Sequence, residues 1–224
     1  MGYRRDTKPN LATGDELTAD MVGIGLLFAF EPSPQPDIED TLLSASIEAM
    51  DKDDLRVFGL LVAWLEQHHR GVNADRLYRG LAHIDSQRVR AFWAGVGKGL
   101  EGRRWGRFAN MYRGPQLNLL AAGGEFHLLQ HGEYPLFQGG PLRVPRNAVE
   151  KRKGDILSPA DLASRHVVYR WRLVIGSTYR ADMWAQIEMD PKTPPAELAR
   201  KTRGSFATAW QVKRDYSVVE QRPH

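Results

Sequence analysis

The chain has 224 residues, of which 42% are hydrophobic and 26% charged, a composition typical of a globular protein with a hydrophobic core. It contains no cysteine, which excludes disulfides, thiolate catalysis, cysteine zinc sites and iron–sulfur clusters. Residues 1–112 hold 14 Lys and Arg against 16 Asp and Glu, a net charge of −2, whereas residues 113–224 hold 17 against 11, a net charge of +6. This asymmetry weakly favours a polyanionic partner.

The first 36 residues are expected to form an amino-terminal arm or small subelement. Their apolar run at 22–30, VGIGLLFAF, is far shorter than the roughly 20 residues that span a bilayer, and acidic residues precede it where a signal peptide would be basic. It predicts a buried strand or a short core helix. The segment EPSPQP at 31–36 ends any element there. We expect a cytoplasmic protein without a membrane partner.

Residues 37–114 predict a helical body. Apolar residues from Ile38 to Met50 recur at helical spacing, and LRVFGLLVAWL at 55–65 is apolar all round, as in the central helix of a bundle. Asn73 is a candidate helix cap, and Asp85 or Ser86 is another. A fifth helix is predicted over 103–112, ended by Gly-Pro.

Residues 115–155 predict short strands and a linker. Apolar pieces at 116–120, 126–129 and 142–144 alternate with Gly-Gly and Pro breaks. Strand geometry would place His127 and His131 too far apart for one ion, so no metal site is expected.

Residues 156–224 predict a carboxy-terminal helical domain. A helix is expected from the cap at Ser158 to about residue 175, then helices at 179–189 and 197–201, a tight turn at 202–204 and a last helix capped by Ser205. The expected fold class is therefore mainly α, with a small β-containing middle segment and a carboxy-terminal helix-turn-helix.

Motifs for catalysis and cofactors are incomplete. Gly23 and Gly25 lack the third glycine of a dinucleotide fingerprint, and the segment 95–99 lacks the spacing of a phosphate loop. The acidic residues at 39–40 and 51–54 are expected to cap helices. We expect no cofactor and no enzymatic activity; an RNA- or nucleotide-processing enzyme is a weaker alternative.

The stretch ELARKTRGSFATAWQVKR at 197–214 resembles the helix-turn-helix family. In that family the turn glycine follows the small residue of the first helix by four. Here Arg203 stands at that spacing and Gly204 comes one later, so the turn is expected to differ. The positions that match the family's apolar and small residues are Leu198, Ala199, Ala209 and Val212.

A helical wheel divides the last helix into two faces. The expected core face, packed on Leu198 and on the 179–189 helix, holds Phe206, Ala209, Trp210, Val212 and Tyr216. The expected outward face holds Ala207, Thr208, Gln211, Arg214 and Asp215. Lys213 falls within the apolar arc and is expected to extend its amine to solvent.

The outward face has the chemistry of base recognition. Gln211 could pair with adenine, Arg214 with guanine, and the Thr208 methyl could touch thymine. Phosphate contacts are expected from Lys201, Arg203 and the helix amino terminus at Ser205. Asp215 on the same face would repel phosphate.

A longer segment, 169–216, with the strings YRADMW and SFATAWQVKRDY, resembles an uncharacterised bacterial family and is similar to the winged-helix antitoxins of type IV toxin–antitoxin systems. The resemblance implies a transcriptional regulator paired with a nucleotidyltransferase-type protein. We therefore predict a sequence-preferring protein that binds double-stranded DNA, as a homodimer. The alternative is a protein-interaction module that docks such a partner without binding DNA.

Overall fold

The computed structural model describes residues 8–149 and 154–220, and within these ranges the protein is mainly helical. A two-stranded parallel sheet pairs Leu117 with Leu142 in its middle segment, as the predicted fold class requires. The helices are α1 (Gly14–Gly23), α2 (Ile38–Asp51), α3 (Leu55–His68), η1 (His69–Gly71), α4 (Ala74–Leu81), α5 (Gln87–Gly99), η2 (Phe108–Asn110), α6 (Gly124–His131), η3 (Pro135–Phe137), η4 (Arg146–Ala148), α7 (Pro159–Arg165), α8 (Val167–Ile175), α9 (Tyr179–Met189), α10 (Pro195–Lys201) and α11 (Phe206–Glu220), and the strands are β1 (Leu117–Asn118) and β2 (Leu142–Arg143).

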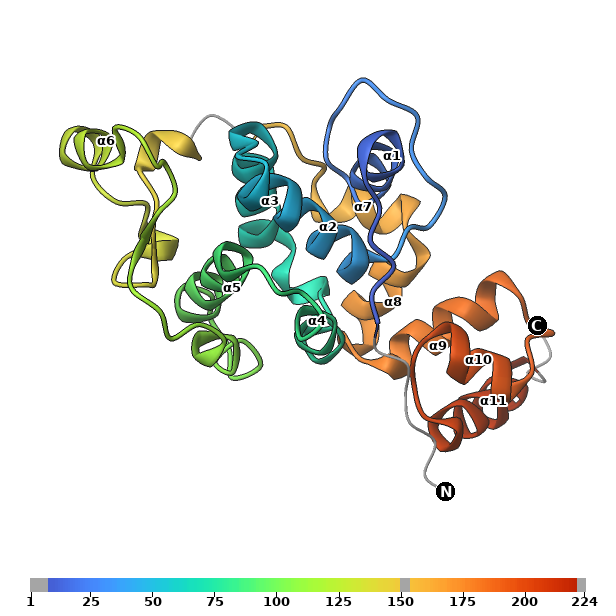
Figure 1. Cartoon of the computed structure of the whole chain (residues 1–224). Coiled ribbons are helices and arrows are strands. Elements are labelled where there is room, and N and C mark those ends of the chain that lie inside the picture. The colour runs from blue at the N-terminus through green and yellow to red at the C-terminus, as the bar shows by residue number, and fades with distance from the viewer. Residues whose placement is uncertain (1–7, 150–153, 221–224) are drawn as a thin grey trace.

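The helices are arranged around α2 and α3 (Figure 1). The segment with α6 lies at one end of the molecule, and α9, α10 and α11 pack together at the other. No helix in the part of the chain that the structure describes is both long and apolar enough to cross a bilayer.

Helix starts follow the predicted caps. The Asn73 side chain accepts a hydrogen bond from the Arg76 amide at 3.2 Å, and Ser86 accepts one from the Val89 amide at 3.2 Å. Ser158 caps α7 in the same way. Each cap satisfies an amide of the first helical turn that has no partner within the helix.

The main core surrounds α3, which is buried on nearly all sides as its sequence predicts. Trp64 is fully buried, and its indole N–H donates to the carbonyl oxygen of Ile24 at 2.8 Å. Trp93 of α5 donates likewise to Ser46 at 3.1 Å. Because both of these indole N–H groups have partners, the Trp64 and Trp93 rings stabilise the core without leaving an unsatisfied donor.

Two predicted elements near the amino-terminal half are wrong. The run 22–30 is neither a strand nor a helix, because α1 ends at Gly23 and Gly25 adopts a φ of +97°. Leu26 then forms only an isolated bridge with Ile156. The predicted helix 103–112 is instead a series of turns ending in η2, whose Phe108 packs on α5.

Two predictions in the second half are also wrong. The piece 126–129 belongs to helix α6, which lies between glycines at positive φ, Gly123 and Gly132. The predicted helix 159–175 is divided into α7 and α8, since His166 has an extended backbone and its ring accepts the Tyr169 amide, capping α8.

The buried apolar side chains form two clusters. The larger extends from Ala12 to Tyr169, so part of the predicted amino-terminal arm contributes to the main core. The smaller belongs entirely to α9, α10 and α11. The predicted domain boundaries at 36, 114 and 155 remain predictions.

Candidate functional site

The turn between α10 and α11 contains the departure from the helix-turn-helix sequence pattern, with Arg203 at the position of the family's glycine. Arg203 has a φ of +55°, the left-handed conformation that glycine usually adopts after a helix. The Arg203 amide donates to the carbonyl oxygen of Arg200 at 3.2 Å, and the Gly204 amide donates to that of Ala199 at 2.9 Å. This pair of hydrogen bonds closes α10, and it places the left-handed residue four positions after Ala199, the family spacing.

Gly204 is required for packing rather than for backbone conformation. A Cβ at this position would lie 2.3 Å from the terminal methyl of Met183 and 3.5 Å from the Cβ of Tyr179. The turn therefore approaches α9 closely. Ser205 follows and caps α11, accepting the Thr208 amide at 3.1 Å, as predicted.

Helices α9, α10 and α11 share a small core. Ala209 and Val212 of α11 are fully buried against Leu198 and Ala199 of α10, which confirms the four predicted packing positions. Met183 and Ile187 of α9 complete the cluster.

The prediction that Phe206 and Trp210 pack in this core is wrong, since 52% of Phe206 and 54% of Trp210 is exposed. The two rings lie one turn apart on a stripe next to the buried one. A wheel ranks them as core because they are apolar, but α9 and α10 cover only the narrower arc of Ala209 and Val212. The Arg214 guanidinium lies 5.4 Å from the Trp210 ring centroid.

Among the predicted base-reading residues, Gln211 and Arg214 are exposed on the same side of α11, whereas Thr208 is half-buried. The Thr208 hydroxyl is hydrogen bonded to Ser205 at 2.6 Å. Asp215 is bound by Arg180 at 2.9 Å, which offsets the charge that would repel phosphate. The Lys213 amine donates to the carbonyl oxygen of Pro191 at 2.6 Å.

The predicted phosphate contacts are already engaged within the protein. Lys201 lies 3.2 Å from Glu197, an exposed pair that contributes little to stability and exchanges readily. Arg203 instead makes two hydrogen bonds to Asp40 of α2, at 2.8 and 2.6 Å, and is only 18% exposed. Arg203 therefore joins α11 to the main core, and we exclude it from the proposed interface.

This contact gives a first prediction. Arg203→Ala should lower the free energy of unfolding by about 2 kcal/mol, because it leaves the buried Asp40 carboxylate without its bidentate partner. Urea denaturation measures the loss. A variant as stable as the unchanged protein would contradict this role.

A buried ionic network connects the same helices to the main core. Arg172 of α8 donates two hydrogen bonds to Glu39 of α2, at 2.7 and 2.8 Å, and one to Asp182 of α9 at 2.7 Å. Arg76 of α4 pairs with Asp37 and lies 3.7 Å from Asp182. The sequence indicated only helix caps here, and no local pattern marks such long-range pairs.

Burial dominates the electrostatics of this network. It raises the pKa of Glu39, although the Arg172 guanidinium acts in the opposite direction. Burial also lowers the pKa of Arg76 to about 9, against the effect of the Asp182 charge. For Arg172, burial alone would lower the pKa, but the Asp182 and Glu39 carboxylates outweigh it and raise the pKa. The network is thus a structural joint and not a solvent-accessible acid–base site.

The two histidines of α6 do not form a metal site with their neighbours. His127 and His131 stack with ring centroids 6.0 Å apart. Within residues 8–149 and 154–220, no three His, Asp or Glu side chains are grouped so that they could hold an ion.

Comparisons with protein-family models, curated proteins and solved structures find no match to this chain. Arguments about function therefore rest on the geometry of its own residues.

Proposed function

We propose that the chain binds double-stranded DNA through the outward face of α11 and acts as a transcriptional regulator. The observation that carries the proposal is the division of α11 into a buried stripe and an exposed polar face. Ala209 and Val212 are buried, while Ala207, Gln211 and Arg214 are exposed. A helix held in this way could enter a major groove, where Gln and Arg pair with base edges.

The turn geometry supports the same proposal. The left-handed residue follows Ala199 by four, and Ser205 caps the second helix, as in the family that the sequence resembles. The amides of the first turn of α11 are suited to phosphate, and Lys201, exposed at the end of α10, could add a further phosphate contact. We include in this proposal that the chain acts like the type IV antitoxins it resembles and is paired with a nucleotidyltransferase-type protein.

The test is a fluorescence anisotropy titration of the purified chain with random and selected DNA duplexes at several salt concentrations. Arg214→Ala should weaken binding about tenfold, and Gln211→Ala should change the preference among sequences. Arg165→Gln, at an exposed position of α7, is the matched control and should have no effect. Absence of binding at low salt, or equal losses in all three variants, would refute the proposal.

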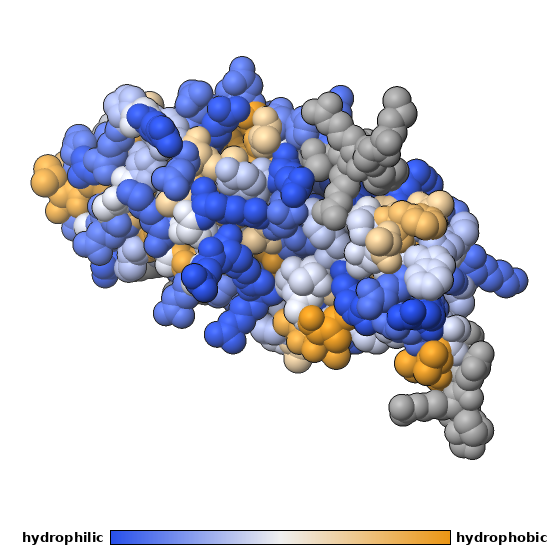
Figure 2. Space-filling model, turned by 90° about the horizontal axis from the view of Figure 1, so that it is seen from below, coloured by the Kyte–Doolittle hydropathy of each residue, from blue (hydrophilic) through white to orange (hydrophobic). Residues whose placement is uncertain are grey.

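A second candidate function is association with a protein through the same face. Phe206 and Trp210 are half-exposed, and Trp and Arg are the side chains most enriched at interface centres. Viewed from below, the end of the molecule formed by α9, α10 and α11 shows apolar patches separated by hydrophilic side chains (Figure 2). The partner we test first is a second copy, because a symmetric dimer pairs the same surface patch of both chains.

Analytical ultracentrifugation tests the second candidate. If α11 forms a dimer, Trp210→Gln should yield monomers at concentrations where the unchanged chain is dimeric. If the unchanged chain is monomeric, self-association through this face is excluded. The anisotropy titration then still tests DNA binding.

A further inference from the structure

Two neighbouring cavities lie between η1, the loop 101–107 and the connection from α8 to α9. The first has a volume of about 590 Å³ and the second about 660 Å³. Both are lined by Arg104, Gly176 and Ser177, so the two cavities adjoin, and we call them the double cavity. Each volume is within the range of roughly 300 to 1,000 Å³ that small-molecule sites occupy.

The lining of the double cavity is rich in arginine. Two carboxylates, Glu101 and Asp75, also line it. Asp75 is already bound by Arg79 at 2.8 Å and by the Tyr179 hydroxyl at 2.9 Å, besides one cavity arginine. The lining therefore keeps an excess of positive charge, contributed by Arg70, Arg103, Arg104 and Arg107.

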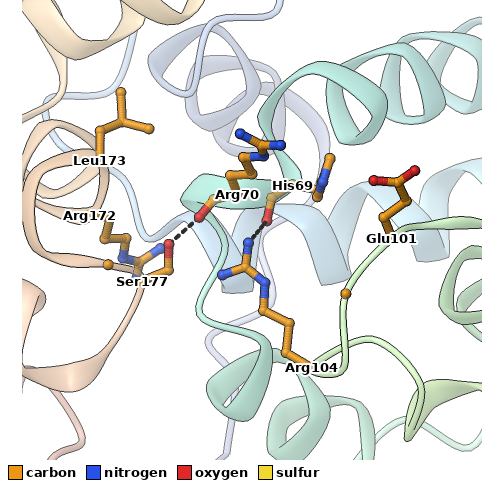
Figure 3. Close-up of a pocket in the computed structure, with 9 residues that line it drawn as sticks. His69, Arg70, Glu101, Arg104, Arg172, Leu173 and Ser177 are labelled. Atoms are coloured by element: carbon orange, nitrogen blue, oxygen red, sulfur yellow. Dashed lines mark hydrogen bonds between the residues drawn. The ribbon is translucent and has the colours of Figure 1, made fainter.

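Three of these arginines lack a carboxylate partner in the described ranges. Arg104 reaches across from its loop and donates to the carbonyl oxygen of His69 at 3.3 Å (Figure 3). Arg70 and Arg103 are exposed and form no ion pair with any described residue. Burial lowers the pKa of Arg104, and the nearby Arg70 charge lowers it further.

Neutral donors complete the lining. The first turn of α9 borders the second cavity through Thr178 and Tyr179, and helix amino termini attract anions. Ser177 donates to the carbonyl oxygen of Arg70, which fixes the α8–α9 connection against η1. Figure 3 shows that Arg70, Arg104 and Ser177 come from three separate segments that converge here.

We infer that this double cavity binds a small ligand that carries two or more linked phosphate groups, such as inorganic pyrophosphate or a nucleoside diphosphate. Guanidinium groups bind phosphate oxygens through paired, charge-assisted hydrogen bonds. Arginines on opposing segments suit adjacent phosphates better than a single anion. The site is separate from the proposed DNA interface, because none of its lining residues belongs to α10 or α11.

Isothermal titration calorimetry of the full chain with pyrophosphate, and separately with ADP, tests the inference. Arg104→Gln and Arg70→Gln should each weaken pyrophosphate binding about tenfold. Arg113→Gln changes an equally exposed arginine outside the cavities and should leave binding unchanged. Because the Arg70 side chain is exposed, Arg70→Gln is expected to fold even if Arg104→Gln does not.

Three results would overturn the inference. The first is the absence of pyrophosphate binding at low salt. The second is a loss of pyrophosphate affinity in the Arg113 variant equal to that in the Arg104 and Arg70 variants. The third is that Arg70 is needed for binding duplex DNA while pyrophosphate does not bind. Binding of pyrophosphate but not ADP would identify the ligand as an inorganic polyphosphate. Binding of ADP but not pyrophosphate would identify it as a nucleotide, and either result supports a phosphate site. Loss of DNA binding in the α11 variants alone would affect only the proposed function.

Discussion

Replacing Arg172 with methionine should lower the free energy of unfolding by about 3 to 5 kcal/mol. Arg172 is 2% exposed, and Glu39 and Asp182 on either side are equally buried. Methionine has a similar length but no charge, so two buried carboxylates would lose the cation that hydrogen bonds to them and would keep only Arg76, at 3.8 and 3.7 Å. The loss is a large fraction of the 5 to 15 kcal/mol by which folded proteins are typically stable.

Arg170 provides the matched control, since it lies two residues earlier in α8. Its partner is Glu188 of α9, and both side chains are about two-fifths exposed. Arg170→Gln should cost less than about 1 kcal/mol, because water solvates the remaining carboxylate. Urea denaturation of both variants at neutral pH makes the comparison. Similar losses in the two would show that the buried network is not the main joint between α8, α9 and α2.

Arg172→Lys distinguishes charge from geometry. Lysine keeps the positive charge but cannot donate the paired hydrogen bonds that reach Glu39 while another reaches Asp182. We expect it to recover only part of the stability lost in the methionine variant. Full recovery would mean that the net charge, and not the guanidinium fork, stabilises the network.

Acid should destabilise the protein strongly between pH 6.5 and 4, because two buried histidines resist protonation. Burial lowers the pKa of His68 and of His166 to about 4, from an ordinary value of 6.5. Between these values the unfolded chain binds more protons than the folded one, so the free energy of unfolding falls as the pH falls. The stability that the two neutral histidines allow is fully present above pH 6.5. Each histidine should contribute a loss of about 2 kcal/mol at pH 5.

Burial keeps both rings neutral, and their hydrogen bonds fit the neutral form. His166 Nε2 lies 2.9 Å from the carbonyl oxygen of Pro36, while its Nδ1 accepts the Tyr169 amide. His68 Nε2 lies 3.0 Å from the carbonyl oxygen of Leu157, and its Nδ1 lies 2.7 Å from the Tyr169 hydroxyl. A second proton on the His166 ring would sit on Nδ1 and point at the Tyr169 amide N–H. Because Nδ1 could then no longer accept that hydrogen bond, protonation would remove the cap of α8.

Urea denaturation across this pH range measures the slope, and NMR titration measures the two pKa values directly. The raised pKa of Glu39 acts in the opposite direction, since it makes the folded chain bind a proton more readily as the pH falls. The histidine part is therefore obtained from His166→Gln, which should flatten the acid slope. His131→Gln, at an exposed position of α6, should not. An unchanged slope in the His166 variant would contradict the assignment.

Several helix starts and the packing of α11 followed from local sequence. The caps at Asn73, Ser86, Ser158 and Ser205 were predictable because each joins a side chain to an amide two or three residues along the same chain. The packing positions at Ala209 and Val212 were predictable from helical periodicity. Gln211 and Arg214 were therefore correctly expected on an exposed face, while their role in DNA binding stays a prediction.

Partners that are distant along the chain were decided by the tertiary structure. Arg203 looked like a phosphate contact in a basic segment, yet its carboxylate partner, Asp40, is 163 residues away. The arginine cavity likewise combines residues near 70, 104 and 177 that no sequence motif connects.

The sequence by itself determined where the capped helices α4, α5, α7 and α11 begin and that the fold is mainly helical, because helix caps and helical periodicity depend on neighbours within one or two turns. It could not determine how wide an arc of α11 would be covered, so Phe206 and Trp210 were wrongly placed in the core. That width depends on how closely α9 and α10 approach. The tertiary structure alone decided it, and it also decided which charges are buried in pairs and which stay exposed.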